Sequence, residues 1–307
     1  MNRVLPVLGG LAALLALAGA ALWLAILLNG PGVLDTLDRI AGGAREARLI
    51  AQRAYGANPA QKLRYYAPAA AGRGLPVIVF VHGGSWQWGD PDDYGFVARA
   101  LVPEGFVVVL AGYRLGEAGR YPAMLEDAAA AIASVRAEVA GMGGDPDRIV
   151  LAGHSAGAYN AVQVALEQRW LAAADVPAPA IRGVVGLSGP YDFHPFTSDA
   201  TRLIFGTAGA GAESQPVNHA RPDAPPMLLA HGEADTLVKP RNTIALAARL
   251  SEAGAPVETA FYPGQDHNAP LLSLASPWRS RRDLVARIAE FAHRVTAVSV
   301  PVQAERL

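Results

Sequence analysis

The sequence predicts an α/β domain in which a mostly parallel central sheet is flanked by helices. Two observations predict this class. From about residue 61 onward, short apolar runs alternate with helical patterns, and several of the runs are continuous in β-branched residues. Continuous runs are typical of strands buried on both faces, whereas half-buried strands alternate apolar and polar residues. Strands that alternate with helices through short loops indicate βαβ units and therefore a parallel sheet.

The expected elements follow one another in a regular order. Residues 62–68 are expected to form an early edge strand that ends at a proline, because proline lacks the N–H group that a sheet ladder needs. The remaining strands are expected at residues 76–82, 105–113, 148–154, 181–189, 225–232 and 256–263. The helices are expected at residues 121–139, 155–170, 241–254 and 280–295.

An apolar segment without a charge, Val4–Leu28, lies near the start of the chain. As a helix it would be about 37 Å long, more than the ~30 Å of a bilayer core, so residues 1–30 predict a single-pass transmembrane anchor. The alternative is a signal peptide, cleaved near Ala18-Gly19-Ala20, and export of the rest. The apolar run continues beyond that position, which favours the anchor. The distribution of arginines leaves the side of the membrane undecided.

The rest of the chain divides into a linker, one large domain and a tail. Residues 31–58 are expected to be a linker with a short helix, and residues 59–298 the α/β domain. Within that domain, residues 192–224 are long and irregular and are expected to form a small lid over one end of the sheet. Residues 299–307 are expected to be a tail.

Composition excludes several classes of function. The net charge is -1, so no basic surface is available to bind nucleic acid. The chain has no cysteine, which excludes disulfides, thiolate metal sites and a cysteine nucleophile. No group of His, Asp and Glu has the spacing of metal ligands, so neither a metal nor another cofactor is expected. The sequence does not indicate an oligomeric state.

Residues 153–157 read Gly-His-Ser-Ala-Gly, between an expected strand and an expected helix. This is the G-x-S-x-G pattern in the context that mounts a serine nucleophile on a sharp turn. Such a turn strains the backbone of Ser155 and leaves no room for side chains at the flanking glycines. For the motif alone, a turn of small residues without chemistry is the alternative. As a nucleophile, Ser155 would lie where the parallel strands end.

A serine hydroxyl becomes a good nucleophile only when a base takes its proton and an acid orients the base. His267, in the loop after the last strand, is the expected base. Asp235, just beyond the preceding strand, is the expected acid, with Glu233 and Asp266 as rivals. The resulting chain order is Ser155, Asp235, His267.

The segment HGGSW, residues 82–86, follows an early buried strand. Its glycines let the backbone approach a reacting carbonyl closely, so the amides of Gly84 and Ser85 and that of Ala156 are the expected donors to an oxyanion. Five aromatic residues are candidates for the walls of a substrate pocket: Trp86, Trp88, Tyr159, Phe193 and Phe196.

The segments HGGSW, GYRL, GHSAG, SGPYDF, HGEAD and YPGQDH together resemble the α/β-hydrolase superfamily. Within it they are similar to esterases of the HGGxW/GHSAG type, related to hormone-sensitive-lipase-like carboxylesterases and arylformamidases. The resemblance runs from about Ala54 to Val295 and implies the α/β-hydrolase fold and hydrolysis of esters or small amides without a cofactor. Ser85, His154 and Gly112 depart from residues common in relatives, which leaves the subfamily and its substrate open.

The expected function is that of a serine hydrolase that cleaves carboxylic esters of short acyl groups through an acyl-enzyme. Two alternatives stay open at this point. One is an arylformamidase, amidase or peptidase that uses the same three residues. The other is a membrane-anchored binding protein without catalytic activity. The expected partners are accordingly a small ester and, through the N-terminal helix, a membrane.

Overall fold

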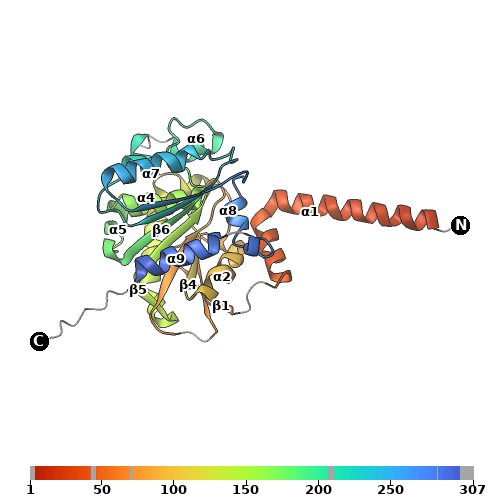
Figure 1. Cartoon of the computed structure of the whole chain (residues 1–307), viewed down its shortest axis with the longest axis horizontal. Coiled ribbons are helices and arrows are strands. Elements are labelled where there is room, and N and C mark those ends of the chain that lie inside the picture. Colours follow the sequence, from red (N-terminus) through yellow and green to blue (C-terminus); the bar gives the residue numbers. More distant parts are fainter. Residues whose placement is uncertain (1–3, 43–45, 70–71, 207–210, 282, 298–307) are drawn as a thin grey trace, which may run out of the picture.

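The computed structural model describes residues 4–42, 46–69, 72–206, 211–281 and 283–297. The expected tail at residues 299–307 lies outside the described residues. Figure 1 shows a body of sheet and helices from which one long N-terminal helix projects.

One sheet of eight strands forms the centre of the body, in the order β1-β2-β4-β3-β5-β6-β7-β8. β1 and β2 pair antiparallel, β2 pairs antiparallel with β4, and the remaining neighbours are parallel. The strands are β1 (Ala47–Ala54), β2 (Lys62–Pro68), β3 (Leu75–Val81), β4 (Val107–Ala111), β5 (Gly144–His154), β6 (Ile181–Leu187), β7 (Met227–Gly232) and β8 (Val257–Tyr262). The expected mostly parallel sheet is therefore confirmed.

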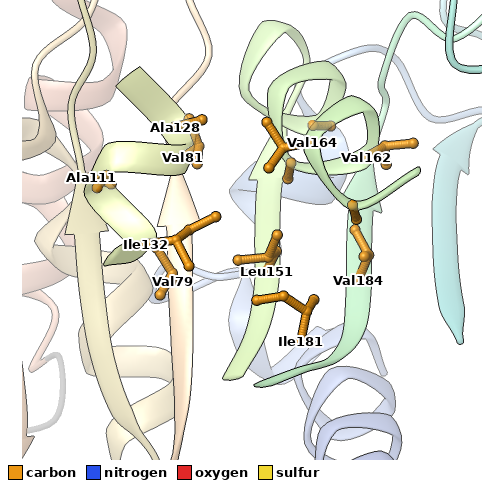
Figure 2. Packing of buried hydrophobic residues seen from close by; sticks show 14 of the residues in the cluster. Val79, Val81, Ala111, Ala128, Ile132, Leu151, Val162, Val164, Ile181 and Val184 are labelled. Carbon is orange, nitrogen blue, oxygen red and sulfur yellow. The ribbon is translucent and has the colours of Figure 1, made fainter. Parts of the chain in front are cut away.

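Helices cover both faces of this sheet. Successive residues of each strand point to opposite faces, so each buried strand contributes side chains to two cores. Val79 and Leu151 belong to the core under α3 and α4, whereas Phe80 and Ala152 belong to the core on the other face. Figure 2 shows the first of these layers, with side chains of β3, β5 and β6 packed against the two helices. Each fully buried aliphatic side chain contributes about 1.5–3 kcal/mol. The helices of the body are α2 (Gly95–Leu101), α3 (Ala123–Glu138), α4 (Ala156–Leu166), α5 (Arg169–Ala173), α6 (Asp199–Phe205), α7 (Arg241–Ala253), α8 (Ala269–Leu272) and α9 (Leu284–Thr296).

The outer strand of the sheet lies in the interval 31–58, which was expected to be a linker with a short helix. Here β1 pairs with β2 from Ala47 opposite Pro68 to Ala54 opposite Lys62. β2 is therefore the second strand, and the expectation that it forms the edge is wrong. No residue of β1 is fully buried, so its sequence carries no alternating apolar pattern from which a strand could be predicted.

The N-terminal helix α1 runs from Val4 to Ile40 and is interrupted at Asn29, where the backbone leaves the helical region (φ -152°, ψ 74°). Pro31 explains the interruption, because it has no N–H to donate to the carbonyl of Leu27 and its ring would clash with that carbonyl in a continuous helix. Beyond it, Asn29 Oδ1 accepts a hydrogen bond from the N–H of Gly32 (3.0 Å) and begins the second part of the helix. By length and composition, the segment Leu14–Ile40 could cross a membrane, a test that a signal sequence also passes.

The second part of α1, residues 30–40, which we call the stem, is bound to the body by charged groups. Asp38 is fully buried and accepts hydrogen bonds from Arg99 Nε (2.5 Å), the N–H of Ser276 (2.7 Å) and Arg279 Nη2 (3.0 Å). Asp35, also buried, pairs with Arg99. A buried charge is stable only with such partners, so the stem is fixed to α2 and to the segment after α8.

Candidate active site

Ser155 occupies the turn between β5 and α4 with a positive φ of 54°. Both flanking glycines are sterically required. A Cβ on Gly153 would lie 2.4 Å from the backbone of Gly157, and one on Gly157 would lie 2.1 Å from the carbonyl oxygen of Val81. The tight contact between β5, α4 and β3 therefore forces the serine into a strained conformation that projects it from the sheet.

Backbone strain is concentrated where the parallel strands end. Among the described residues other than glycine, five have a positive φ: Ser85, Trp86, Ser155, Asp175 and Ser188. All except Asp175 closely follow the carboxyl ends of β3, β5 and β6. Strained residues persist where the surrounding structure holds them and cluster at functional sites. The carboxyl ends of the parallel strands, where the sequence predicted Ser155 to lie, are thus also where the backbone is strained.

The structure brings the three predicted residues into one chain of hydrogen bonds. His267 Nε2 lies 2.9 Å from Ser155 Oγ, and His267 Nδ1 lies 2.7 Å from Asp235 Oδ2. Because a carboxylate can only accept, Nδ1 carries the proton and its N–H donates a hydrogen bond to Asp235, which leaves Nε2 to accept a hydrogen bond from the hydroxyl of Ser155. All three side chains are buried. A base oriented by an acid and in contact with a hydroxyl is the arrangement that activates a serine nucleophile.

Asp235 has more partners than the base alone. Its Oδ2 also lies 3.1 Å from Nε2 of the buried His231, and its Oδ1 accepts the N–H groups of Leu237 (2.9 Å) and Val238 (2.8 Å). Burial acts to raise the pKa of Asp235, but hydrogen bonds from His231 and His267 outweigh burial and hold this pKa well below its usual range. Asp235 is therefore an anion at neutral pH and can stabilise a protonated His267.

His154, the residue before the serine, holds the loop of the base. Its Nε2 lies 3.1 Å from the carbonyl oxygen of His267 and must donate to it, since a carbonyl only accepts. Burial, and then the nearby His267, lower the pKa of His154 to about 3. His154 therefore stays neutral and makes this hydrogen bond across the working pH range.

The two rival acids lie elsewhere. The side chain of Glu233 is exposed to solvent. Asp266 Oδ1 accepts the N–H groups of Asn268 (3.1 Å) and Ala269 (3.0 Å) at the start of α8. Within the described residues, no group of three or more His, Asp or Glu side chains could hold a metal ion.

The predicted oxyanion donors lie next to the serine. Gly84 has a φ of +117°, and a Cβ there would lie 2.0 Å from the carbonyl oxygen of Trp88, so only glycine fits. The carbonyl of Gly84 accepts the N–H groups of Gln87 and Trp88, which fixes the turn. In the described part of the chain, the amides of Gly84, Ser85 and Ala156 donate to no protein acceptor. These amides are therefore available to bind an oxyanion.

A cleft of about 330 Å³ opens above Ser155. Of the predicted pocket residues, Trp86 and Phe193 line it. Tyr159 is fully buried behind Trp86, and Phe196 packs against Phe193 instead of lining the cleft. The expectation that Trp88 lines the pocket is wrong, because its side chain is 71% exposed and lies outside the cleft. The turn at Gly84 separates it from Trp86, whose indole N–H donates to the buried Asn160 (3.0 Å).

Sequence reasoning did not single out the other residues that line the cleft. They come from the segment after β6 that includes the expected lid, from the turn between β7 and α7 and from the start of α7: Pro190, His194, Pro195, Thr197, Ser198, Ala200, Thr201, Leu237, Val238, Lys239, Arg241 and Asn242. One signal was present in the sequence. Lys239 is one of only two lysines and lies four residues after the predicted acid.

Comparison with known proteins gives a family and several relatives. The model of the BD-FAE family matches residues 63–250. Kynurenine formamidase of Danio rerio is 34% identical over 166 residues, which are 53% of this chain and 54% of the relative. Esterase LipQ of Mycobacterium tuberculosis is 32% identical over 231 residues, 69% of this chain and 54% of the relative. The chain thus spans a little over half the length of these curated relatives.

A solved structure, that of a mutant of esterase rPPE, is also similar. It superposes with a TM-score of 0.67 at 25% identity, over 86% of this chain and 87% of that one. A truncated carbohydrate esterase from gut microbiota superposes with a TM-score of 0.69 at 18% identity, over 82% of this chain and 98% of that one. The similarity in fold therefore extends over more than four fifths of this chain.

Proposed function

Because the chain belongs to the BD-FAE family and has the α/β-hydrolase fold, we propose that it is a serine esterase that hydrolyses carboxylic esters. The observation that carries this proposal is the unbroken hydrogen-bond sequence from Ser155 through His267 to Asp235. Beside it lie backbone amides that have no acceptor among the described residues. Both features support acyl transfer, which requires an activated hydroxyl and donors to an oxyanion.

In the first half of the reaction, Ser155 Oγ attacks the carbonyl carbon of the ester while His267 Nε2 takes the hydroxyl proton. The carbonyl oxygen becomes an oxyanion that the amides of Gly84, Ser85 and Ala156 bind. One such donor contributes about 10²–10³ in kcat. Asp235 remains an anion and stabilises the imidazolium.

In the second half, the tetrahedral intermediate collapses, the bond to the alcohol oxygen breaks, and His267 gives its proton to the departing alcohol. Water then attacks the acyl-enzyme while His267 takes one of its protons. The second intermediate releases the carboxylic acid and returns the proton to Ser155 Oγ.

The cleft supports a short acyl group. Its volume of about 330 Å³ is at the lower end for small-molecule sites. Trp86 and Phe193 form an apolar wall that is fixed from behind by Phe205. A steep preference for long-chain triglycerides over acetate and butyrate esters would contradict this part of the proposal.

A turnover assay tests the proposed esterase directly. With p-nitrophenyl acetate, we expect Ser155→Ala to retain at most a few per cent of the turnover, because the nucleophile is lost. Ser251→Ala, which changes an exposed serine of α7, is the matched control and should match the wild type. Retention of a larger fraction by Ser155→Ala would contradict the mechanism.

A second candidate is hydrolysis of N-formyl aryl amides, and the similarity to a kynurenine formamidase favours it. The same residues suffice, with His267 protonating the departing amine. Comparison of kcat/KM for an aryl ester, an N-formyl aryl amide and an aminopeptidase substrate distinguishes the candidates. The esterase proposal requires the ester to have the largest value.

The proposal includes membrane attachment through α1. Cleavage near Ala20 would leave Ala21–Leu28 on the mature protein, and within it Trp23, Leu27 and Leu28 are each more than 60% exposed. A soluble product would carry this apolar end in water, which favours an uncleaved anchor. We expect the protein to stay in the membrane fraction at alkaline pH and to have the mass of the full chain. Release of a shorter protein would indicate a cleaved signal peptide instead.

A further inference from the structure

The charged side chains that line the active-site cleft all have the same sign. Lys239 and Arg241 are its only lysine and arginine, and no aspartate or glutamate is among the described residues that line it. His194 is the one other titratable side chain besides these two. A substrate bound above Ser155 therefore meets two positive charges that no carboxylate of the lining neutralises.

Neither Lys239 nor Arg241 is neutralised by a carboxylate in the described part of the protein. Lys239 and Arg241 are exposed, and they form no ion pair with any described carboxylate. Of the acids in the lid, Asp199 is paired with Arg202 (2.7 Å). Asp192, whose N–H donates to Asn242 Oδ1 (2.8 Å), is not among the residues that line the cleft. Most arginines of the body do have carboxylate partners, and Arg249, two turns further along α7, pairs with Glu252 (3.3 Å).

The backbone that carries these side chains is held firmly next to the acid of the triad. Asp235 Oδ1 binds two amides of the turn, and the carbonyl of Lys239 accepts both the N–H and the side-chain amide of Asn242. Asn242 Oδ1 in turn accepts the N–H groups of Tyr191 and Asp192, where the lid begins. The two cations therefore start from fixed positions at the cleft, although their side chains reach into solvent.

The direction of α7 adds to the positive potential. This helix begins at Arg241, no side chain caps its N-terminus, and Asn242 in its first turn lines the cleft. The N-terminal end of a helix carries partial positive charge. A negative group in the cleft thus meets two side-chain charges and the helix end together.

We propose that the natural substrate is an ester that carries a carboxylate apart from the bond that is cleaved, and that Lys239 and Arg241 bind this carboxylate. The inference rests on the proposed esterase function and adds the class of substrate. A guanidinium matches the geometry of a carboxylate, and an ammonium adds a point charge. In a cleft of about 330 Å³ the carboxylate and the reacting carbonyl must belong to a small molecule.

Matched pairs of esters test the proposal on the full-length protein in detergent. One pair is 4-acetoxybenzoate and 4-acetoxybenzamide, in which the charge lies on the alcohol part. The other is monomethyl adipate and methyl adipamate, in which it lies on the acyl part. After division by the uncatalysed rates, we expect kcat/KM to favour the anionic member of at least one pair by about ten-fold, mostly through KM.

Substitutions then locate the effect. The double variant Lys239→Gln/Arg241→Gln should abolish the preference, and the double variant Lys239→Glu/Arg241→Glu, which makes this part of the lining negative, should reverse it. Arg249→Gln, on the same helix but away from the cleft, is the matched control and should keep the preference. The readout is the ratio within a pair, so a general loss of activity in a variant does not change it. The wild type also provides a test without any variant, because 1 M salt shortens the screening length to about 3 Å and should reduce the preference.

The outcomes separate this inference from the proposed function. Hydrolysis of the neutral esters with no preference in either pair would overturn the inference and leave the esterase intact. A preference that survives in the double variant or in 1 M salt would also overturn it, because the two cations would not be its source. Failure to hydrolyse any ester would instead refute the proposed function.

Discussion

Asp235 shows how much of the site depends on single residues. Its two oxygens accept hydrogen bonds from two imidazoles and two backbone amides. His231 is itself held on its other side, with Nδ1 2.8 Å from Thr243 Oγ1 at the start of α7. The carboxylate therefore has little freedom to turn away from His267. The sequence predicted the acid and the base, but not His231 as a second partner of the acid.

Gly84 provides a prediction at the same scale. Gly84→Ala would place a Cβ 2.0 Å from the carbonyl oxygen of Trp88, a steric clash that the turn could relieve only by moving. Because the turn positions two of the oxyanion donors, we expect kcat to fall by about 10²–10³ in an assay with p-nitrophenyl acetate.

The control for this variant is another glycine with positive φ. Gly254, at the end of α7, has a φ of +83° with open space around it. Gly254→Ala should lower the free energy of unfolding by about 1 kcal/mol and leave kcat unchanged. An equal loss of kcat in both variants would show that Gly84 acts only through stability.

Among the elements, the stem of α1 is the one that joins the N-terminal helix to the body. The carboxylate of Asp38 has three donors, from α2 and from the segment after α8. Asp38→Ala would leave Arg99 and Arg279 without this buried partner. We expect it to lower the free energy of unfolding by about 3 kcal/mol, measured by chemical denaturation in detergent.

An exposed ion pair gives the comparison for Asp38. Glu252 pairs with Arg249, and both side chains are more than 60% exposed. Glu252→Ala should therefore cost less than about 1 kcal/mol. If the two variants were equally stable, the stem would be only loosely attached to the body.

The elements differ in how far the sequence could predict them. The strands from β3 to β7 are rich in buried apolar residues, and the patterns at 76–82, 148–154 and 225–232 located β3, β5 and β7 within a few residues. β1 has no buried face, so its pairing with β2 depends on tertiary contact and escaped prediction. The same holds for the cleft. Ser155 and the oxyanion loop at the bottom of the cleft could be predicted from sequence motifs. The walls come from the lid and from the turn between β7 and α7, and no local sequence pattern determines the path of these segments.

For the molecule as a whole, two buried histidines predict how stability depends on pH. Burial lowers the pKa of His82 to about 4 and that of His154 to about 3. In the unfolded chain both would bind a proton below about pH 6.5, while the folded protein keeps them neutral. The free energy of unfolding should therefore fall as pH decreases from about 6.5 to 4, by up to ~1.4 kcal/mol per pH unit for each histidine.

Urea unfolding at pH 7, 6 and 5 measures this dependence. His154→Gln removes one of the two groups, so its stability should fall less steeply with decreasing pH than that of the wild type. The low pKa of Asp235 causes a loss only below its ordinary value of about 3.9, outside this range. Parallel curves for variant and wild type would show that His154 is not kept neutral by the fold.

The proposed mechanism depends most on Ser155 as the group that attacks the substrate, because the turn after β5, its backbone strain and the hydrogen bond to His267 all position its hydroxyl. The most direct measurement is reaction of the full-length protein with a fluorophosphonate, followed by peptide mass spectrometry. We predict one covalent adduct, on Ser155, and at least a hundred-fold slower labelling in His267→Ala, which lacks the base. An adduct on another residue, or ester turnover that persists after treatment while Ser155 carries no adduct, would contradict Ser155 as the nucleophile.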